Sequence, residues 1–76
     1  FNAQASLYPN PANSMVYIKS EMDFESAEIY NGIGQQIMML SLDSSQKLNL
    51  NRICSGVYTM ILKTKTHSKV LRLIKK

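Results

Sequence analysis

The chain of 76 residues has few of the residue types that reinforce small proteins or carry out chemistry. It contains one cysteine, one histidine and no tryptophan. Cys54 alone cannot form an intramolecular disulfide, and together with His67 it falls short of the four ligands of a structural zinc site. No recognisable motif links the two as nucleophile and base. We therefore expect no catalytic residue, no metal site and no cofactor.

Long apolar runs are also missing. No segment approaches the roughly 18 apolar residues of a membrane-spanning helix, so we expect no direct membrane insertion. Residues 1–6 lack the basic and then apolar order of a signal peptide, and the chain is interpreted as part of a longer protein. Apolar residues make up 45% of the sequence, which is an ordinary share for a globular domain. One small domain is expected, burying about 60% of its unfolded surface.

Acidic residues are absent from the second part of the chain. Residues 1–43 hold all five acids and one lysine, whereas residues 44–76 hold eight basic residues, so the two parts carry charges of −4 and +8. This distribution predicts a positive potential at one edge or end of the fold. The alternative is a solvated face whose lysines protect an edge strand. No aromatic platform lies among the basic residues, which argues against nucleic-acid binding. Those near the end are Lys63, Lys65, Lys69, Arg72, Lys75 and Lys76.

Short alternating segments follow one another along the chain. In residues 14–19, Val16 and Ile18 share one face, which we expect to point inward. Leu48 and Leu50 alternate in the same way, and Phe24 is expected to tuck against the core from a polar connection. Residues 57–64 are almost continuously apolar, which is typical of a central strand covered on both sides. The predicted strands are one ending at Tyr8 and those at 14–19, 27–31, 36–42, 47–51, 57–64 and 69–75.

The turns between these segments complete the fold prediction. Residues 31–34 (Asn-Gly-Ile-Gly) contain two glycines able to adopt positive φ and predict a hairpin, and residues 43–46 form a turn by composition. No segment shows sustained helical periodicity. About seven short strands at spacings of roughly 8 to 12 residues predict an all-β fold, a small immunoglobulin-like antiparallel β-sandwich.

Several single residues have ordinary structural interpretations. Asn10 stands between two prolines, where its amide is expected to bond nearby backbone. Gly56 is expected where a side chain would clash or where φ is positive. Tyr58 is interpreted as a packed aromatic residue whose hydroxyl finds a partner at the rim. Cys54 is expected to be a small buried hydrophobe, and the five methionines are expected to fill gaps in the core.

Four short phrases follow one another along nearly the whole chain. The first three contain Tyr8, Pro9, Asn10 and Pro11, then Gly34, and then Gly56, Val57 and Tyr58. The fourth is a basic and apolar last strand: Lys69, Val70, Leu71, Arg72, Leu73, Ile74 and Lys75, followed by Lys76. In their order and spacing, these phrases resemble the C-terminal sorting domain of the type IX (Por) secretion system of Bacteroidetes. Gln35 stands where that family often has a basic residue, and Ile53 stands where it usually has leucine.

The resemblance implies a delivery label and not an enzyme. It places a cargo domain before this chain, with residues 1–5 as the end of an upstream linker and residues 6–76 as the sorting domain. It implies transit through the periplasm, recognition by the outer-membrane secretion machinery and removal by a sortase-like peptidase. Because residues 69–76 combine an apolar strand with the densest positive charge, we expect the recognition to occur there. The cargo would then reach the cell surface or the medium. The alternative is a small carbohydrate-binding or adhesion module, against which stand the missing tryptophan and the scattered tyrosines.

Overall fold

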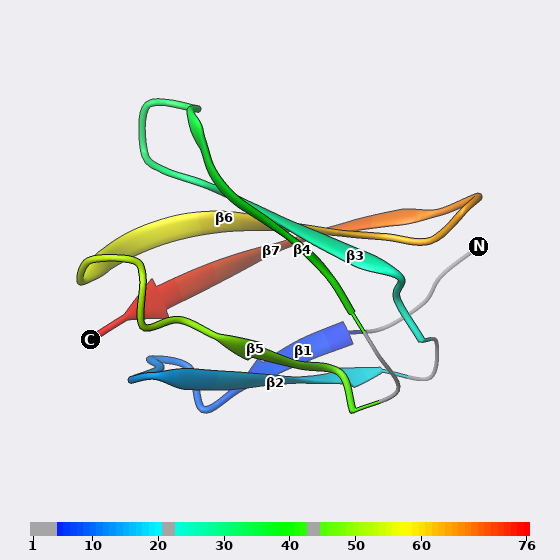
Figure 1. Ribbon diagram of the computed structural model, residues 1–76, viewed down its shortest axis with the longest axis horizontal. Helices are drawn as coiled ribbons and strands as arrows, with labels where there is room; N and C mark the ends of the chain where they lie inside the picture. Colours follow the sequence, from blue (N-terminus) through cyan, green and yellow to red (C-terminus); the bar gives the residue numbers. More distant parts are fainter. Residues whose placement is uncertain (1–4, 21–22, 43–44) are drawn as a thin grey trace.

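The computed structural model describes residues 5–20, 23–42 and 45–76, and every regular element within them is a β-strand (Figure 1). This confirms the predicted all-β fold. The expected linker end at residues 1–5 and the expected turn at residues 43–46 lie partly outside the described residues. The strands are β1 (Ala5–Tyr8), β2 (Met15–Ser20), β3 (Ser26–Tyr30), β4 (Gln36–Ser41), β5 (Lys47–Asn49), β6 (Gly56–Lys63) and β7 (Ser68–Lys75).

The seven strands form two antiparallel sheets that face each other as two layers (Figure 1). The three-stranded sheet, called the small sheet, has the order β1-β2-β5, and the four-stranded sheet, called the large sheet, has the order β4-β3-β6-β7. This distribution is that of an immunoglobulin-like sandwich, with one difference from constant-type domains: the fourth strand pairs with the third instead of joining the first sheet. The predicted β-sandwich is confirmed. Its four edge strands are β1, β5, β4 and β7.

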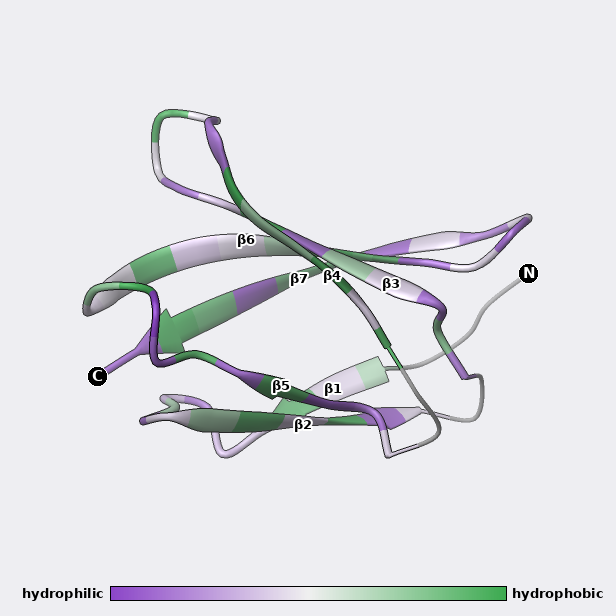
Figure 2. Cartoon of the chain, viewed as in Figure 1, coloured by the Kyte–Doolittle hydropathy of each residue, from purple (hydrophilic) through white to green (hydrophobic). Residues whose placement is uncertain are grey.

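The core lies between the layers and follows the predicted alternation, because successive side chains of a strand point to opposite faces. Val16 and Ile18 are buried as predicted, and Leu48 and Leu50 close the core from β5 and the residue after it. Figure 2 shows apolar stretches along the strands of both layers and a hydrophilic turn between β6 and β7. The large sheet contributes Ala27, Ile29, Tyr58, Met60, Leu62 and Leu73.

Two connections are fixed by side chains. Phe24 is 2% exposed, which confirms the prediction that it packs against the core. The buried Gln46 side chain satisfies the backbone of Phe24: its Oε1 accepts a hydrogen bond from the Phe24 N–H, and its Nε2 donates to the Phe24 carbonyl, both at 3.0 Å. In the β3–β4 hairpin only Gly34 has the predicted positive φ, at 85°, whereas Gly32 does not.

Three expectations about burial were wrong. Strand β6 is central, between β3 and β7, but only one of its faces is covered, and Val57 is 57% exposed. No second layer of described residues covers the outer face of this strand. Met60 fills the core as predicted, whereas Met39 is 63% exposed. Cys54 is exposed because it lies in the turn that leads into β6.

Candidate functional site

Strand β7 is an edge strand whose outer side is occupied by the loop after β1. The side-chain Nδ2 of Asn10 donates a hydrogen bond to the Arg72 carbonyl, and its Oδ1 accepts one from the Ile74 N–H, both at 3.0 Å. One amide thus replaces two hydrogen bonds of a neighbouring strand. The prediction that Asn10 bonds nearby backbone was right in chemistry and wrong in place, since its partners are 62 and 64 residues away.

The backbone of Ala12 continues this contact. Its N–H donates to the Ile74 carbonyl and its carbonyl accepts from the Lys76 N–H, both at 2.7 Å, as an isolated parallel bridge opposite Lys75. The Ala12 side chain is fully buried. Pro9 and Pro11, with φ fixed by their rings, flank the asparagine and deliver both groups to the same strand edge. We call this contact of residues 10–12 with residues 72–76 the clasp.

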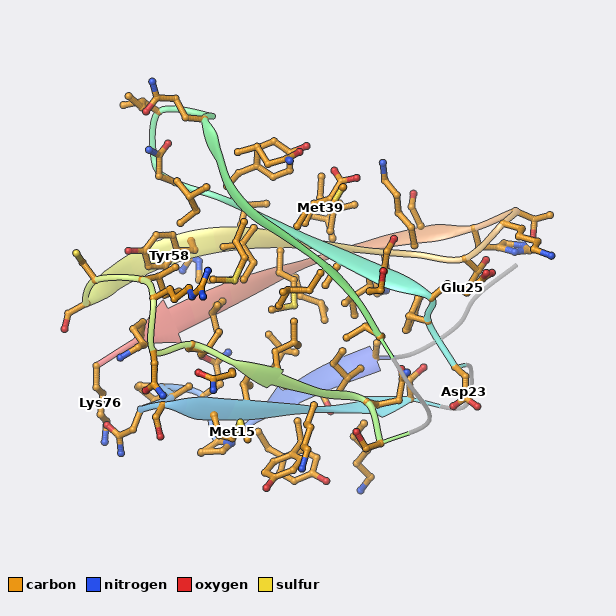
Figure 3. The ribbon with its side chains drawn as sticks, in the orientation of Figure 1. Met15, Asp23, Glu25, Met39, Tyr58 and Lys76 are labelled. Carbon is orange, nitrogen blue, oxygen red and sulfur yellow. The ribbon has the colours of Figure 1, made fainter. Side chains whose placement is uncertain are left out.

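The opposite edge of the same part of β7, away from the clasp, pairs with the start of β6. Gly56, Val57 and Tyr58 stand opposite Lys75, Ile74 and Leu73 in antiparallel register. Two of the sequence motifs, some forty residues apart, therefore hold the end of β7 from both sides. Figure 3 shows Tyr58 and Lys76 at the same end of the molecule.

Tyr58 fixes the corner that leads into β6. Its ring is 9% exposed and its hydroxyl donates a hydrogen bond of 2.6 Å to the Cys54 carbonyl, four residues upstream, which confirms the predicted packing and satisfied hydroxyl. This is the tyrosine corner of immunoglobulin-like domains. Gly56 has a φ of 156°, which confirms the expectation of a positive φ at this position. The alternative expectation, a steric clash, was wrong, since an added Cβ would lie 3.7 Å from the Tyr58 ring.

Gly34 is not part of this arrangement. It lies in the hairpin between β3 and β4, and β4 and β7 are opposite edges of the four-stranded sheet. Its N–H donates to the Asn31 carbonyl at 3.1 Å, which gives it a local role in the turn. Seven of the eight motif residues are thus brought together around the clasp or the adjoining strands, and one is not.

An aromatic contact that sequence reasoning missed lies on the outer face of the small sheet. The Tyr8 and Tyr17 rings stack with centroids 5.4 Å apart, and the side chains are 51% and 37% exposed. The two residues are directly opposite in the β1–β2 register. The signal was available: the turn after Tyr8 and the alternation of the next strand place both rings on the outer face. The tyrosines are therefore less scattered than the sequence suggested.

The basic residues near the end of the chain do not gather at one end of the fold. Lys63 and Lys65 lie at the β6–β7 turn, whereas Lys76 follows the other end of β7, roughly 25 Å away at 3.3 Å per residue. They line the length of an edge instead. Lys63 is also engaged in an ion pair, with its Nζ 2.9 Å from Oε2 of Glu28.

This ion pair belongs to a small polar network on the outer face of the large sheet. The Tyr30 hydroxyl donates a 2.7 Å hydrogen bond to Oε1 of Glu28. That hydrogen bond, and then the one from Lys63, lowers the pKa of the Glu28 carboxyl below its ordinary value, and the same carboxylate raises the pKa of Lys63. The network fixes side chains of β3 and β6, and the basic residues of β7 form no ion pair within the part of the chain that the structure describes.

The described residues offer no other recognisable chemical centre. Within residues 5–20, 23–42 and 45–76, no three histidine, cysteine or acidic side chains come close enough to hold a metal ion. No helix in the same ranges is long and apolar enough to cross a membrane. The distinctive feature of the structure is therefore the clasped, basic edge strand.

Comparison with known protein families gives a match that covers nearly the whole chain. A search of curated proteins finds no significant match. The family described as the secretion system C-terminal sorting domain matches residues 6–76, which is nearly the whole chain and includes every strand from β2 to β7. This match confirms the resemblance drawn from the sequence. The chain belongs to the family of C-terminal sorting domains of the type IX secretion system.

Proposed function

We propose that the clasped strand β7 is the part of this sorting signal that the secretion machinery reads. As a family member, the domain directs secretion through the outer membrane to the cell surface or the extracellular space. The observation that carries the proposal is the clasp itself. Two family motifs hold residues 72–76 from opposite sides, although β7 already pairs with β6 along its full length.

Two properties of β7 support recognition there. Arg72 and Lys76 are exposed and lie among the eight basic residues of the positively charged second part of the chain, so they can steer the domain toward an acidic receptor. The clasp also keeps the end of an edge strand from fraying, so a receptor meets a preformed surface and loses less conformational entropy on binding. The proposed recognition residues are those of the basic last strand, residues 69–76.

The proposal includes the route and the fate of the domain. It travels through the periplasm behind its cargo, is bound by the outer-membrane machinery, and is removed by a sortase-like peptidase in the linker before β1. The pairing of β1 with β2 along Ala5–Tyr8 supports a cut upstream of residue 5, because that cut would leave every strand pair intact. The domain is then the substrate of the peptidase and has no catalytic activity, metal, cofactor or nucleic-acid partner of its own.

A carbohydrate-binding or adhesion module is the second candidate, and the stacked Tyr8–Tyr17 pair is the observation in its favour. Exposed aromatic rings are a common platform for sugar rings, but these two rings cover part of each other. Titration of the domain with soluble bacterial polysaccharide, followed by tyrosine fluorescence, tests this candidate. Saturable binding that is lost in Tyr17→Ala would favour it over sorting as the role of that face.

Export of a passenger tests the sorting function. Residues 1–76 are fused behind a signal peptide and a reporter domain in a Bacteroidetes host, and the reporter is measured in the periplasm, at the surface and in the medium. The fusion is expected to export the reporter, and deletion of residues 69–76 is expected to leave it in the periplasm. A full-length fusion that stays in the periplasm, although folded and stable, would contradict the proposal. Because the deletion also removes Leu71 and Leu73 from the core, gentler variants are needed to locate recognition.

A further inference from the structure

The four edge strands of the sandwich are protected to very different degrees. Edge strands of natural proteins are usually short, covered, or marked with lysine or proline, because their free backbone groups can pair with other chains. Strands β1 and β5 have four and three residues, and β7 is clasped and basic. Strand β4 has six residues, Gln-Ile-Met-Met-Leu-Ser, without a charge or a proline. It is the least protected of the four edges.

The backbone of β4 presents hydrogen-bonding groups to the outside. Leu42 follows β4 directly, and its N–H donates to the carbonyl of Glu25, just before β3, at 2.8 Å. Because backbone groups alternate in direction along an antiparallel strand, those of Met39 and Ser41 face away from β3. No described residue forms a hydrogen bond with them. Figure 3 shows Met39 on the side of its sheet that faces away from the small sheet, where it is 63% exposed.

A groove lies beside this edge. It has a volume of about 630 Å³ and runs between β4 and the segment that follows β5. Its apolar wall is formed by residues 37–40, and its polar wall by Asn49, Asn51 and Arg52. Arg52 is the one charged residue among the described residues of the lining, and both Asn51 and Arg52 are exposed. The groove thus combines the unpaired edge of β4, an apolar wall and the positive charge of Arg52.

We propose that the β4 edge and this groove receive an extended segment of a partner protein, which adds a strand to the large sheet and places a carboxylate on Arg52. The segment is apolar at the positions that face Ile37 to Leu40 and acidic opposite the polar wall. This inference rests on the proposed function, since the partner would belong to the secretion machinery. It adds a second contact surface, on the opposite sheet edge from β7.

Charge complementarity decides in favour of an acidic segment. Among the described residues, the lining contains no acidic side chain and Arg52 has no ion-pair partner, and the domain carries a net charge of +4. A second copy of the chain would bring the same +4 charge to the interface, which opposes association. Strand addition supplies affinity through main-chain hydrogen bonds and specificity through alternate side chains. An extended acidic segment at this edge would supply the main-chain hydrogen bonds and, through its carboxylate opposite Arg52, the specificity.

Binding of a synthetic probe tests the inference. The probe is a capped peptide of alternating valine and threonine with glutamate at its centre and ends, and the control peptide carries lysine at the glutamate positions. Binding to the full chain is followed by backbone amide NMR shifts and by hydrogen exchange. The glutamate peptide is expected to protect the amides of Met39 and Ser41 and to bind at least about tenfold tighter than the lysine peptide.

Two variants sharpen the test without disturbing the clasp or the core. Arg52→Glu is expected to reverse the preference between the two peptides. Met39→Lys places a gatekeeper charge on the edge and is expected to weaken the glutamate peptide about tenfold or more. Lys19→Glu, on the small sheet, serves as the matched charge control and should leave both affinities unchanged. Urea midpoints equal to that of the unmodified domain show that each variant is folded.

Several results would overturn the inference: no binding of the glutamate peptide at about 1 mM, equal affinities for the two peptides, protection of β7 instead of β4, or a dimer of the chain with its β4 amides protected. Export separates this failure from that of the proposed function. If the unmodified fusion exports its reporter but Met39→Lys and Arg52→Glu export it equally well, the β4 edge has no part in sorting while the sorting function stands.

Discussion

The side-chain amide of Asn10 forms hydrogen bonds with both the Arg72 carbonyl and the Ile74 N–H, and so takes the place of a neighbouring strand at the edge of the large sheet. This contact joins the first motif of the chain to its last strand. Ala12 extends it by two further backbone hydrogen bonds. The end of β7 is therefore held in place by residues about sixty positions earlier in the sequence.

Replacing Asn10 should weaken this attachment. Asn10→Ala removes two exposed hydrogen bonds and is expected to lower the free energy of unfolding by about 1–2 kcal/mol. Asn10→Asp keeps the acceptor for the Ile74 N–H but sets an oxygen against the Arg72 carbonyl, so it should be no more stable than the alanine variant. Urea midpoints measure both, and hydrogen exchange should be faster at Ile74 and Lys76. Asn13→Ala, at a nearby exposed position, is the control. Midpoints indistinguishable from that of the control would contradict a stabilising role for the amide.

Removal of the Tyr58 hydroxyl tests the corner before β6. Tyr58→Phe keeps the packed ring but loses the 2.6 Å hydrogen bond to the Cys54 carbonyl, and should destabilise the domain by about 1 kcal/mol. Tyr17→Phe is the matched control, because the Tyr17 side chain lies on the outer face of the small sheet. Thermal or urea unfolding of the two variants provides the comparison. Equal stabilities would show that the corner is held by packing alone.

The two glycine positions should respond differently to a side chain. Gly56 has a φ of 156°, which L-residues rarely adopt, and it enters the central strand of the large sheet. Gly56→Val should therefore cost more than about 1 kcal/mol through backbone strain. A Cβ added at Gly32 would meet open space, and its φ is not positive, so Gly32→Ala should be neutral or stabilising by up to about 1 kcal/mol. Urea midpoints in the reverse order would remove the argument for a constrained backbone at Gly56.

Acid should destabilise the network on the outer face of the large sheet. The pKa of Glu28 is lowered by the Tyr30 hydroxyl and by Lys63, so its contribution to stability is present above the ordinary value of 4.5 and is lost as the pH falls through the lowered value. Glu28→Gln removes the titrating group and should lose less stability than the unmodified domain between about pH 7 and about pH 3. Glu25→Gln keeps the network and should retain the acid sensitivity. Parallel pH profiles for all three proteins would refute this role for Glu28.

The alternation of apolar and polar residues predicted the strands and their inward faces, which depend on local sequence. Val16 with Ile18, and Leu48 with Leu50, identified the inward faces because a strand places alternate residues on one side. The prediction that β6 is covered on both faces was wrong, because an apolar sequence does not reveal whether a second layer exists. The exposure of Cys54 was missed because it depends on a corner, and the partners of Asn10 were missed because they depend on how the two sheets pack. The candidate site could be named from its motifs, but its geometry needed the fold.

Export of a charge-reversed domain tests the recognition of β7 most directly. Arg72 and Lys76 are exposed on the clasped strand, so Arg72→Glu with Lys76→Glu should leave folding nearly unchanged, since exposed charges contribute little to stability. The matched control is Lys19→Glu with Lys47→Glu, which makes the same change in net charge on the small sheet. In the passenger fusion, the β7 variant should accumulate in the periplasm while the control is exported at the normal rate. Normal export of a folded β7 variant would contradict the account and show that the basic edge is only a solvated face.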